Sequence, residues 1–192
     1  MKPIGILLIC AGLSAAQQRA VSSGPPVPHE DPGACPFEGC IYRTWTANRT
    51  VVVRTQRRAD APVVFRLAKG ARVQALTGVV VTVKAGRVEF PKPIVLPAQP
   101  EPLRIQQGET LYLLTSRGEG FTKAWFKGRY YDDVDGSDIF NVACDQYPER
   151  CVGRIVEQPT RVWWVQIQDE RKRVGWTGEP EAFDGKDALD GR

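Results

Sequence analysis

The sequence predicts a mainly β protein, and three features of its 192 residues support this. Turn signals recur roughly every 8 to 12 residues, a spacing typical of small barrels and sandwiches. The segments between the turns are rich in β-branched residues, and several alternate apolar with polar positions. No segment carries the apolar stripe of an amphipathic helix, although residues 132–150 leave room for one short helix.

Glycine turns and charged pairs bound the predicted strands. Gly78 separates the third strand from the fourth, and Ala85-Gly86 ends the fourth. Gly108 precedes the fifth, Gly128 follows the sixth, and Asp169-Glu170 forms the turn of a final hairpin. In chain order, the predicted strands are residues 50–54, 62–67, 72–76, 79–83, 109–114, 121–126, 161–168 and 173–177.

Two proline-rich segments divide the chain. Residues 17–34 contain proline, serine and glycine without a hydrophobic period, which predicts a tether. Residues 91–102, PKPIVLPAQPEP, are predicted to be a linker or long loop, because proline removes backbone donors and is disfavoured inside a sheet. The predicted β-units are therefore residues 35–90 and residues 103–192.

The first sixteen residues are predicted to be a cleaved signal peptide. Lys2 supplies the positive start, Ile4 to Leu13 is largely apolar, and Ser14-Ala15-Ala16 offers small residues for cleavage. This apolar run is about half the roughly 20 residues that span a bilayer, and no other segment is longer, so no membrane span is expected. We expect a periplasmic or secreted protein. Lipidation of Cys10 is the alternative, although the large Ile9 precedes it.

Export agrees with the cysteine pattern. Cys35, Cys40, Cys144 and Cys151 remain after removal of the signal, and an even number favours two disulfides in an oxidising compartment. Three pairings are possible, and the short loops favour Cys35–Cys40 and Cys144–Cys151. A four-thiolate zinc site is the alternative, but the six residues between Cys144 and Cys151 exceed the usual spacing. We expect no metal.

Composition and motifs argue against nucleic-acid binding and catalysis. The formal net charge is +4, and the stretches Arg54–Arg58 and Arg171–Arg173 are short; we interpret them as solvated turns, with anion-contacting patches as the alternative. His29 is the only histidine and lies in the predicted tether, where it has no rigid partner for nucleophilic catalysis. No glycine-rich phosphate loop follows a strand. The sequence predicts no enzyme, no cofactor and no nucleic-acid partner.

An acidic cluster at residues 131–138 raises the question of calcium. Four carboxylates surround Gly136, and calcium takes six to eight oxygen ligands. With Gly136 as the sixth residue of an EF-hand loop, however, Tyr131 and Val142 would fill the first and twelfth positions, and neither offers a carboxylate. We interpret the cluster as a solvated turn or a helix cap.

Aromatic residues on two strands mark a candidate ligand site. Because strand side chains alternate between faces, Trp163 is expected in the core and Trp164 toward solvent. The same alternation places Trp125 in a row between Lys123 and Lys127. An exposed tryptophan beside cations suits a sugar ring or a peptide. The predicted ligand-binding residues are Lys123, Trp125, Lys127, Tyr130 and Trp164, and the alternative for Trp125 is packing under residues 132–160.

Three stretches resemble the bacterial SH3 domain, a small five-stranded barrel. The first runs from Val51-Val52-Val53-Arg54 through an apolar strand to Lys69-Gly70 and Val73. Residues 107–126 resemble the middle strands. Residues 163–177, with two tryptophans and a Gly-Trp pair, resemble the closing hairpin. Residues 132–160 depart from the pattern as an insertion that carries both late cysteines.

The resemblance implies two small SH3-like barrels, or alternatively one elaborated barrel with an insertion. It also implies that Trp176 packs against the barrel, and that the domains bind peptidoglycan or short peptides. We therefore expect an exported, non-enzymatic binding module of a bacterial cell envelope, whose partner is cell-wall glycan or a peptide. The alternative is a structural or assembly protein that contacts other envelope proteins.

Overall fold

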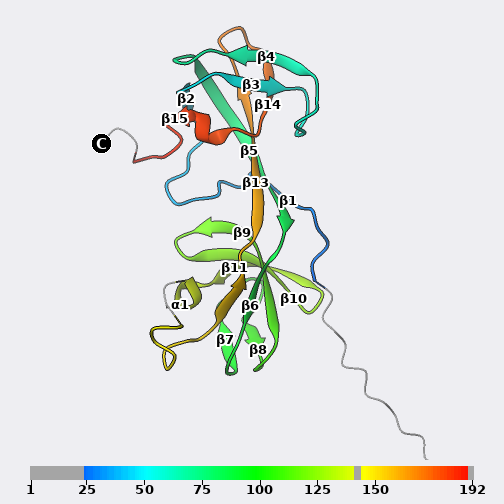
Figure 1. Cartoon of the computed structure of the whole chain (residues 1–192), viewed down its shortest axis with the longest axis vertical. Coiled ribbons are helices and arrows are strands. Elements are labelled where there is room, and N and C mark those ends of the chain that lie inside the picture. The colour runs from blue at the N-terminus through cyan, green and yellow to red at the C-terminus, as the bar shows by residue number, and fades with distance from the viewer. Residues whose placement is uncertain (1–23, 141–143, 190–192) are drawn as a thin grey trace, which may run out of the picture.

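The computed structural model describes residues 24–140 and 144–189, and its architecture is mainly β, as predicted (Figure 1). Its strand ladders are antiparallel. The short helix α1 (Ser137–Phe140) lies in the region that left room for one. The predicted signal peptide, Cys10 and the start of the predicted tether lie outside the described residues.

The first sheet is built around β5, the longest strand of the described chain, and β13. Both edges of β5 are paired: β13 lies along one, while β2 and β1 (His29–Pro32) share the other. A 3-10 turn at Pro180–Ala182 precedes the last strand. In spatial order the sheet consists of β15 (Phe183–Asp184), β2 (Thr44–Ala47), β5 (Arg72–Lys84), β13 (Thr160–Gln168), β14 (Val174–Thr177), β3 (Val51–Arg54) and β4 (Val63–Leu67).

A second, curled sheet lies at the other end of the molecule. The hairpin of β7 (Ile94–Leu96) and β8 (Leu103–Ile105) packs beside it, and a bridge between Gln99 and Asp132 connects this hairpin to β11. In spatial order the sheet consists of β11 (Arg129–Asp135), β10 (Phe121–Phe126), β9 (Thr110–Gly118), β6 (Gly86–Glu89) and β12 (Arg154–Glu157).

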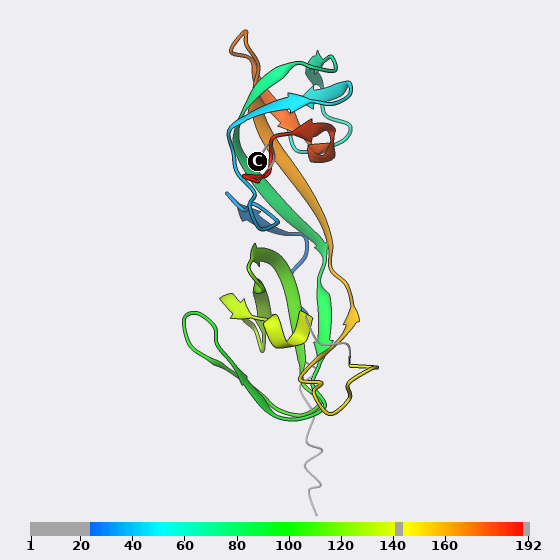
Figure 2. The same ribbon diagram turned by 90° about the vertical axis from the view of Figure 1, so that its left-hand side faces the viewer.

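Each sheet surrounds its own hydrophobic core, which divides the molecule into two lobes. The first lobe combines residues 34–80 with residues 160–184, and Trp45, Trp163 and Phe183 are its largest buried side chains. The second lobe is built from the continuous run 86–157, around buried residues such as Phe90 and Leu111. β5 and β13 run side by side from the first lobe toward the second (Figures 1 and 2).

This arrangement differs from two consecutive units at 35–90 and 103–192. Strands from both predicted units share the first sheet, because β13 pairs with β5 and Trp176 of β14 pairs with Arg54 of β3. The second lobe is an insertion between β5 and β13, and it covers residues 86–157 rather than 132–160. Long-range pairing, which local sequence patterns do not specify, determines this grouping.

Both proline-rich segments contribute strands and core residues, in addition to connecting other parts of the fold. In the predicted tether, residues 29–32 form β1, and Ala34 is buried in the first core. In the predicted linker, residues 94–96 form β7, and Leu96 is buried in the second core. The prolines of residues 97–102 lie mainly in the turn between β7 and β8, where no ladder donor is required.

The two disulfides are those favoured by the short loops. Cys35 is bonded to Cys40 beside the first core, and Cys144 is bonded to Cys151 in the second lobe, so the cysteines do not form one four-thiolate zinc site. Within the described residues, we find no helix with the length and hydropathy of a membrane span.

Candidate binding surface

The surface proposed around Trp125 lies on the outer face of β9, β10 and β11. Strand β10 alternates as predicted: Thr122, Ala124 and Phe126 are buried, whereas Lys123 and Trp125 are half-buried on the opposite face. The inward residues pack into the second core. The outward residues are thereby held on a rigid sheet rather than on a loop.

Three aromatic side chains form a row across this face, which we call the aromatic row. Trp125 of β10 lies opposite Tyr112 of β9 and opposite Tyr130 of β11. Directly opposed residues of adjacent strands share a face of the sheet. The Trp125 and Tyr130 rings meet edge to face, with centroids 4.6 Å apart, a geometry that aromatic pairs favour.

Residues 24–32, which we call the N-terminal segment, cross the aromatic row. At one end, a Cβ added to Gly24 would lie 3.5 Å from Cε1 of Tyr112. At the other end, the His29 and Tyr130 ring centroids are 4.9 Å apart. The proline-rich run between these contacts, residues 25–28, bends at Val27-Pro28 and leads directly into β1.

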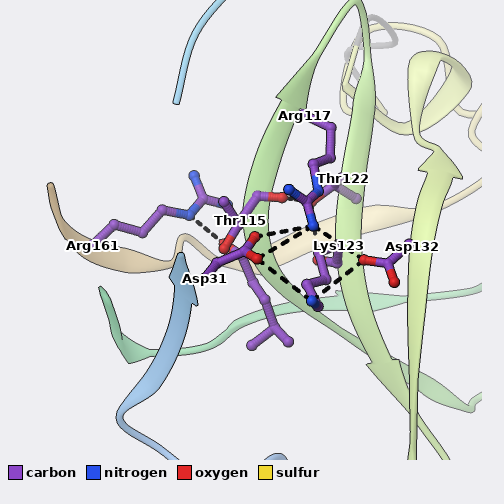
Figure 3. Close-up of polar contacts among 8 residues, drawn as sticks. Asp31, Thr115, Arg117, Thr122, Lys123, Asp132 and Arg161 are labelled. Carbon is purple, nitrogen blue, oxygen red and sulfur yellow. Dashed lines mark hydrogen bonds and ion pairs between the residues drawn. The ribbon is translucent and has the colours of Figure 1, made fainter. Parts of the chain in front are cut away.

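A ring of alternating charges fixes the end of the N-terminal segment (Figure 3). Asp31 of β1 lies 3.2 Å from Arg117 and 3.6 Å from Lys123, and both cations also reach Asp132, at 3.1 and 3.4 Å. We call these four residues the charge ring. The Asp31 side chain is only 7% exposed, so its ion pairs are screened far less than surface pairs.

Several buried polar atoms gather at the same junction. Within the part of the chain that the structure describes, those without a hydrogen-bond partner are His29 Nε2, Asp31 Oδ2, Thr82 Oγ1 and Thr115 Oγ1. Asp31 Oδ2 is 3.2 Å from Arg117 Nη2 but lacks hydrogen-bonding geometry, and Oδ1 accepts the bond instead. Unsatisfied buried groups reduce stability, so each of these atoms would gain from an added hydrogen-bond partner.

Two side chains donate to backbone carbonyl oxygens beneath the charge ring, and the first of these bonds joins the lobes. The Nε of Arg161, from β13, donates to the carbonyl oxygen of Leu114 in β9 (Figure 3). The hydroxyl of Thr122 donates to the carbonyl oxygen of Thr115 at 3.0 Å. Burial lowers the pKa of the Arg161 guanidinium. The N-terminal segment therefore lies where both lobes meet.

His29 differs from the solvated histidine that the sequence predicts. It lies in β1, half-buried, with Thr82 as its partner on β5. Burial, followed by the positive charge of Lys123, lowers the pKa of His29 below its usual value of 6.5, although Asp31 and Asp132 act in the opposite direction. The imidazole is therefore predominantly neutral at pH 7.

The structure brings together three of the five predicted ligand-binding residues. Lys123, Trp125 and Tyr130 are neighbours, with the Lys123 ammonium 6.0 Å from the Tyr130 ring centroid. Lys127 is separate, because β10 ends at Phe126 and Lys127 adopts a positive φ of 47° in the following turn. It pairs there with Glu109 at 2.6 Å.

Trp164 belongs to another surface, on β13. Its ring lies over Gly178, where an added Cβ would be 3.2 Å away. Trp176 lies opposite Gln166, so it shares the outer face with Trp164 and is half-buried. Trp176 is thus no more enclosed than Trp164, which is also half-buried, whereas the expectation that Trp163 is core is confirmed.

Five contributors were not predicted as site residues: His29, Asp31, Tyr112, Arg117 and Asp132. Tyr112 could have been found by extending the alternation of β10 to its neighbour β9. Asp31 and Arg117 carry no such signal, because their contact spans 86 positions of sequence.

The acidic cluster at 131–138 has roles that its spacing did not specify. Asp132 enters the charge ring, and Asp135 accepts a hydrogen bond from the backbone amide of Ser137 at 3.0 Å, which caps α1. The bonds from Ser137 lower the pKa of Asp135. Among the described residues, no three His, Cys, Asp or Glu side chains are arranged to hold a metal ion.

Comparisons of the chain with protein-family profiles, with curated proteins and with solved structures found no significant match.

Proposed function

We propose that the chain is an exported, non-enzymatic binding module of a bacterial cell envelope, and that the outer face of β9, β10 and β11 binds an extended peptide. One observation carries the proposal: a proline-rich segment of the same chain crosses the aromatic row, with Gly24 beside Tyr112 at one end and the His29 ring against Tyr130 at the other. A surface that holds one such segment has the shape and chemistry to hold another.

The chemistry of the surface supports recognition. Aromatic grooves bind proline-rich segments because these are already extended and lose little conformational entropy on binding. Lys123 and Arg117 add cations at the end of the aromatic row, so the surface offers both apolar contact and charge selection. These are stacking and ion-pairing groups, which suit binding rather than bond breaking.

The two disulfides support the location. They are compatible with an oxidising compartment outside the cytoplasm. The sequence adds the predicted signal peptide at residues 1–16.

An array of proline-containing decapeptides and a pull-down with purified cell wall test the proposal. We expect the full chain to bind a subset of the peptides, and Trp125→Ala to weaken that binding at least tenfold. Trp164→Ala is the matched control, because it removes another half-buried tryptophan that lies on β13 of the first sheet and outside the aromatic row. It should leave binding unchanged. Capture by cell wall alone, insensitive to Trp125→Ala, would contradict a peptide site on this face.

A further inference from the structure

We infer that the ligand is a proline-rich extended segment of another protein, with a carboxylate at the position of Asp31, and that it binds by replacing residues 24–32. The inference rests on the proposed function and goes further, because it names the ligand class and assigns the N-terminal segment the role of a built-in competitor.

The edge of β5 at residues 79–82 supplies the backbone half of this site. β13 covers one edge of these residues, and β1 is their partner on the other. β1 has only four residues, and the next contact along the chain is the 2.8 Å bond from Gly33 N to Gly78 O. If β1 detached, the freed edge could accept an incoming strand through the same ladder.

The charge ring supplies the selectivity. Asp31 and Asp132 together balance Arg117 and Lys123, and Asp132 belongs to β11, which stays in place. When Asp31 leaves, Arg117 and Lys123, whose side chains are 28% and 16% exposed, share one carboxylate. A replacing strand that lacks a carboxylate leaves this charge uncompensated, whereas one that carries it restores the ring.

The N-terminal segment leaves much of its own surface in solvent, so it can be outcompeted. Pro26, Val27 and Pro28 are exposed, with Val27 at 48%. A partner with larger side chains at these positions would gain contacts that the resident segment does not make. The unpartnered Oγ1 atoms of Thr82 and Thr115 offer further gains.

Because residues 24–32 act as a built-in competitor, the ligand is a segment of a different protein rather than the same segment of a second copy of this chain. A segment attached to its own site has a high effective concentration, which for short linkers reaches the millimolar range. The same segment from another copy makes the same contacts without that advantage. Only a ligand with better contacts than residues 24–32 displaces them.

The test measures binding of a peptide with the sequence of residues 24–33, GPPVPHEDPG, to the full chain by calorimetry. Asp31→Asn weakens the resident segment without changing its shape. We expect this variant to bind the peptide at least tenfold more tightly than the wild type does. The peptide GPPVPHENPG should bind the variant at least tenfold more weakly than GPPVPHEDPG, because it lacks the carboxylate.

Glu30→Ala is the matched control. Glu30 is the adjacent acidic residue of β1, and its pair with Arg57 is partly exposed on both sides, at 48% and 30%, so it contributes little. The Glu30→Ala variant should bind the peptide with the same affinity as the wild type. Hydrogen exchange of the wild type adds a readout independent of any variant: residues 79–82 should lose protection from β1 before the first lobe unfolds.

Four results would overturn the inference. If Asp31→Asn binds both peptides equally, and Trp125→Ala abolishes both, the carboxylate is irrelevant although the proposed function stands. If residues 79–82 exchange only on global unfolding, the segment is not displaceable, and the decapeptide array decides the proposed function separately. If Asp31→Asn forms dimers without peptide, the occupant is a second copy. If Glu30→Ala binds the peptide as tightly as Asp31→Asn does, the charge ring is not what holds residues 24–32 in the site.

Discussion

Trp163 and Trp164 are adjacent in β13 and lie in opposite environments. Trp163 is 8% exposed, contacts Trp45 edge to face and donates its Nε1 proton to the Tyr42 hydroxyl at 3.2 Å. Trp164 lies on the outer face over Gly178. We expect Trp163→Ala to lower the free energy of unfolding by about 3–5 kcal/mol, because it leaves a cavity in the first core.

Trp164→Ala should lower the free energy of unfolding much less. Urea unfolding followed by circular dichroism measures both variants. Equal losses would mean that the register of β13 is shifted by one residue, since such a shift exchanges the two faces. The outward position of Trp176, opposite Gln166, would then fail as well.

His29 should make stability depend on pH between neutrality and mild acid. Burial and the nearby Lys123 lower its pKa in the folded state, whereas the unfolded chain binds the proton near the usual value of 6.5. Below about pH 6.5 the unfolded state therefore holds more protons, so stability falls as pH falls toward the lowered pKa. Denaturant unfolding at pH 7.5 and pH 5.5 measures the difference.

His29→Phe is the control for that pH dependence. It keeps a ring against Tyr130 but cannot titrate, so its stability should change less between the two pH values. Glu109, Asp135 and Asp169 have lowered pKa values in the folded state. The stability that they contribute is therefore present at both of these pH values and is lost only at more acidic pH. An unchanged pH dependence in His29→Phe would show that protonation of His29 does not change the free energy of unfolding.

Alternation along a single strand predicts the part of the site that lies on β10. No local sequence pattern predicts the part that lies on β1. Lys123 and Trp125 follow from a period of two, and Tyr130 follows them across the hairpin. His29 and Asp31 belong to HEDP, four residues with no apolar alternation and a final proline. Their environment depends on β5, about fifty positions further along the chain, where His29 meets Thr82.

At the scale of elements, strands with β-branched residues and clear turns were predicted well. Residues 121–126 form β10 as predicted, and residues 51–54 and 63–67 form β3 and β4. Gly78 was expected to end a strand but lies inside β5. The hydroxyl of Tyr42 and the indole of Trp163 pack so closely there that an added Cβ would be 2.2 Å from the Tyr42 oxygen.

Except for β11, the strands that were missed have two to four residues, and sheet partners rather than composition make all of them strands. β7 and β8 have three residues each and lie within or next to a proline-rich segment. β11 is rich in aspartate on its outer face, and β12 joins the sheet through Val88 and its neighbours on β6. Propensity is weak at such positions, so tertiary pairing decides them.

At the scale of the whole molecule, the first lobe is built from both ends of the described chain, and the second lobe is inserted between them. Two of the stretches that resemble the bacterial SH3 domain, residues 51–73 and 163–177, lie in one sheet. Their separation along the chain predicts two units. In the structure, strands that are far apart in sequence pair with each other. Cross-strand partners, such as Arg54 and Trp176, carry no local signal.

Because each lobe contains one disulfide, the two bridges should act independently. Cys35–Cys40 closes a loop beside the first core, and Cys144–Cys151 closes one in the second lobe, with sequence separations of 5 and 7. Closing such short loops restricts the unfolded chain and stabilises by about 2–3 kcal/mol each. Replacing either pair by serine should lower the free energy of unfolding by that amount.

The variant without both bridges provides the decisive measurement. Sites in separate cores add within about 0.5 kcal/mol, so the combined loss should equal the sum of the two single losses. Non-reducing peptide mapping of the wild type should find only the two local pairs. A peptide that joins Cys35 or Cys40 to Cys144 or Cys151 would contradict the separation of the lobes. A combined loss far from the sum would instead show that β5 and β13, which connect the lobes, transmit the destabilisation of one core to the other.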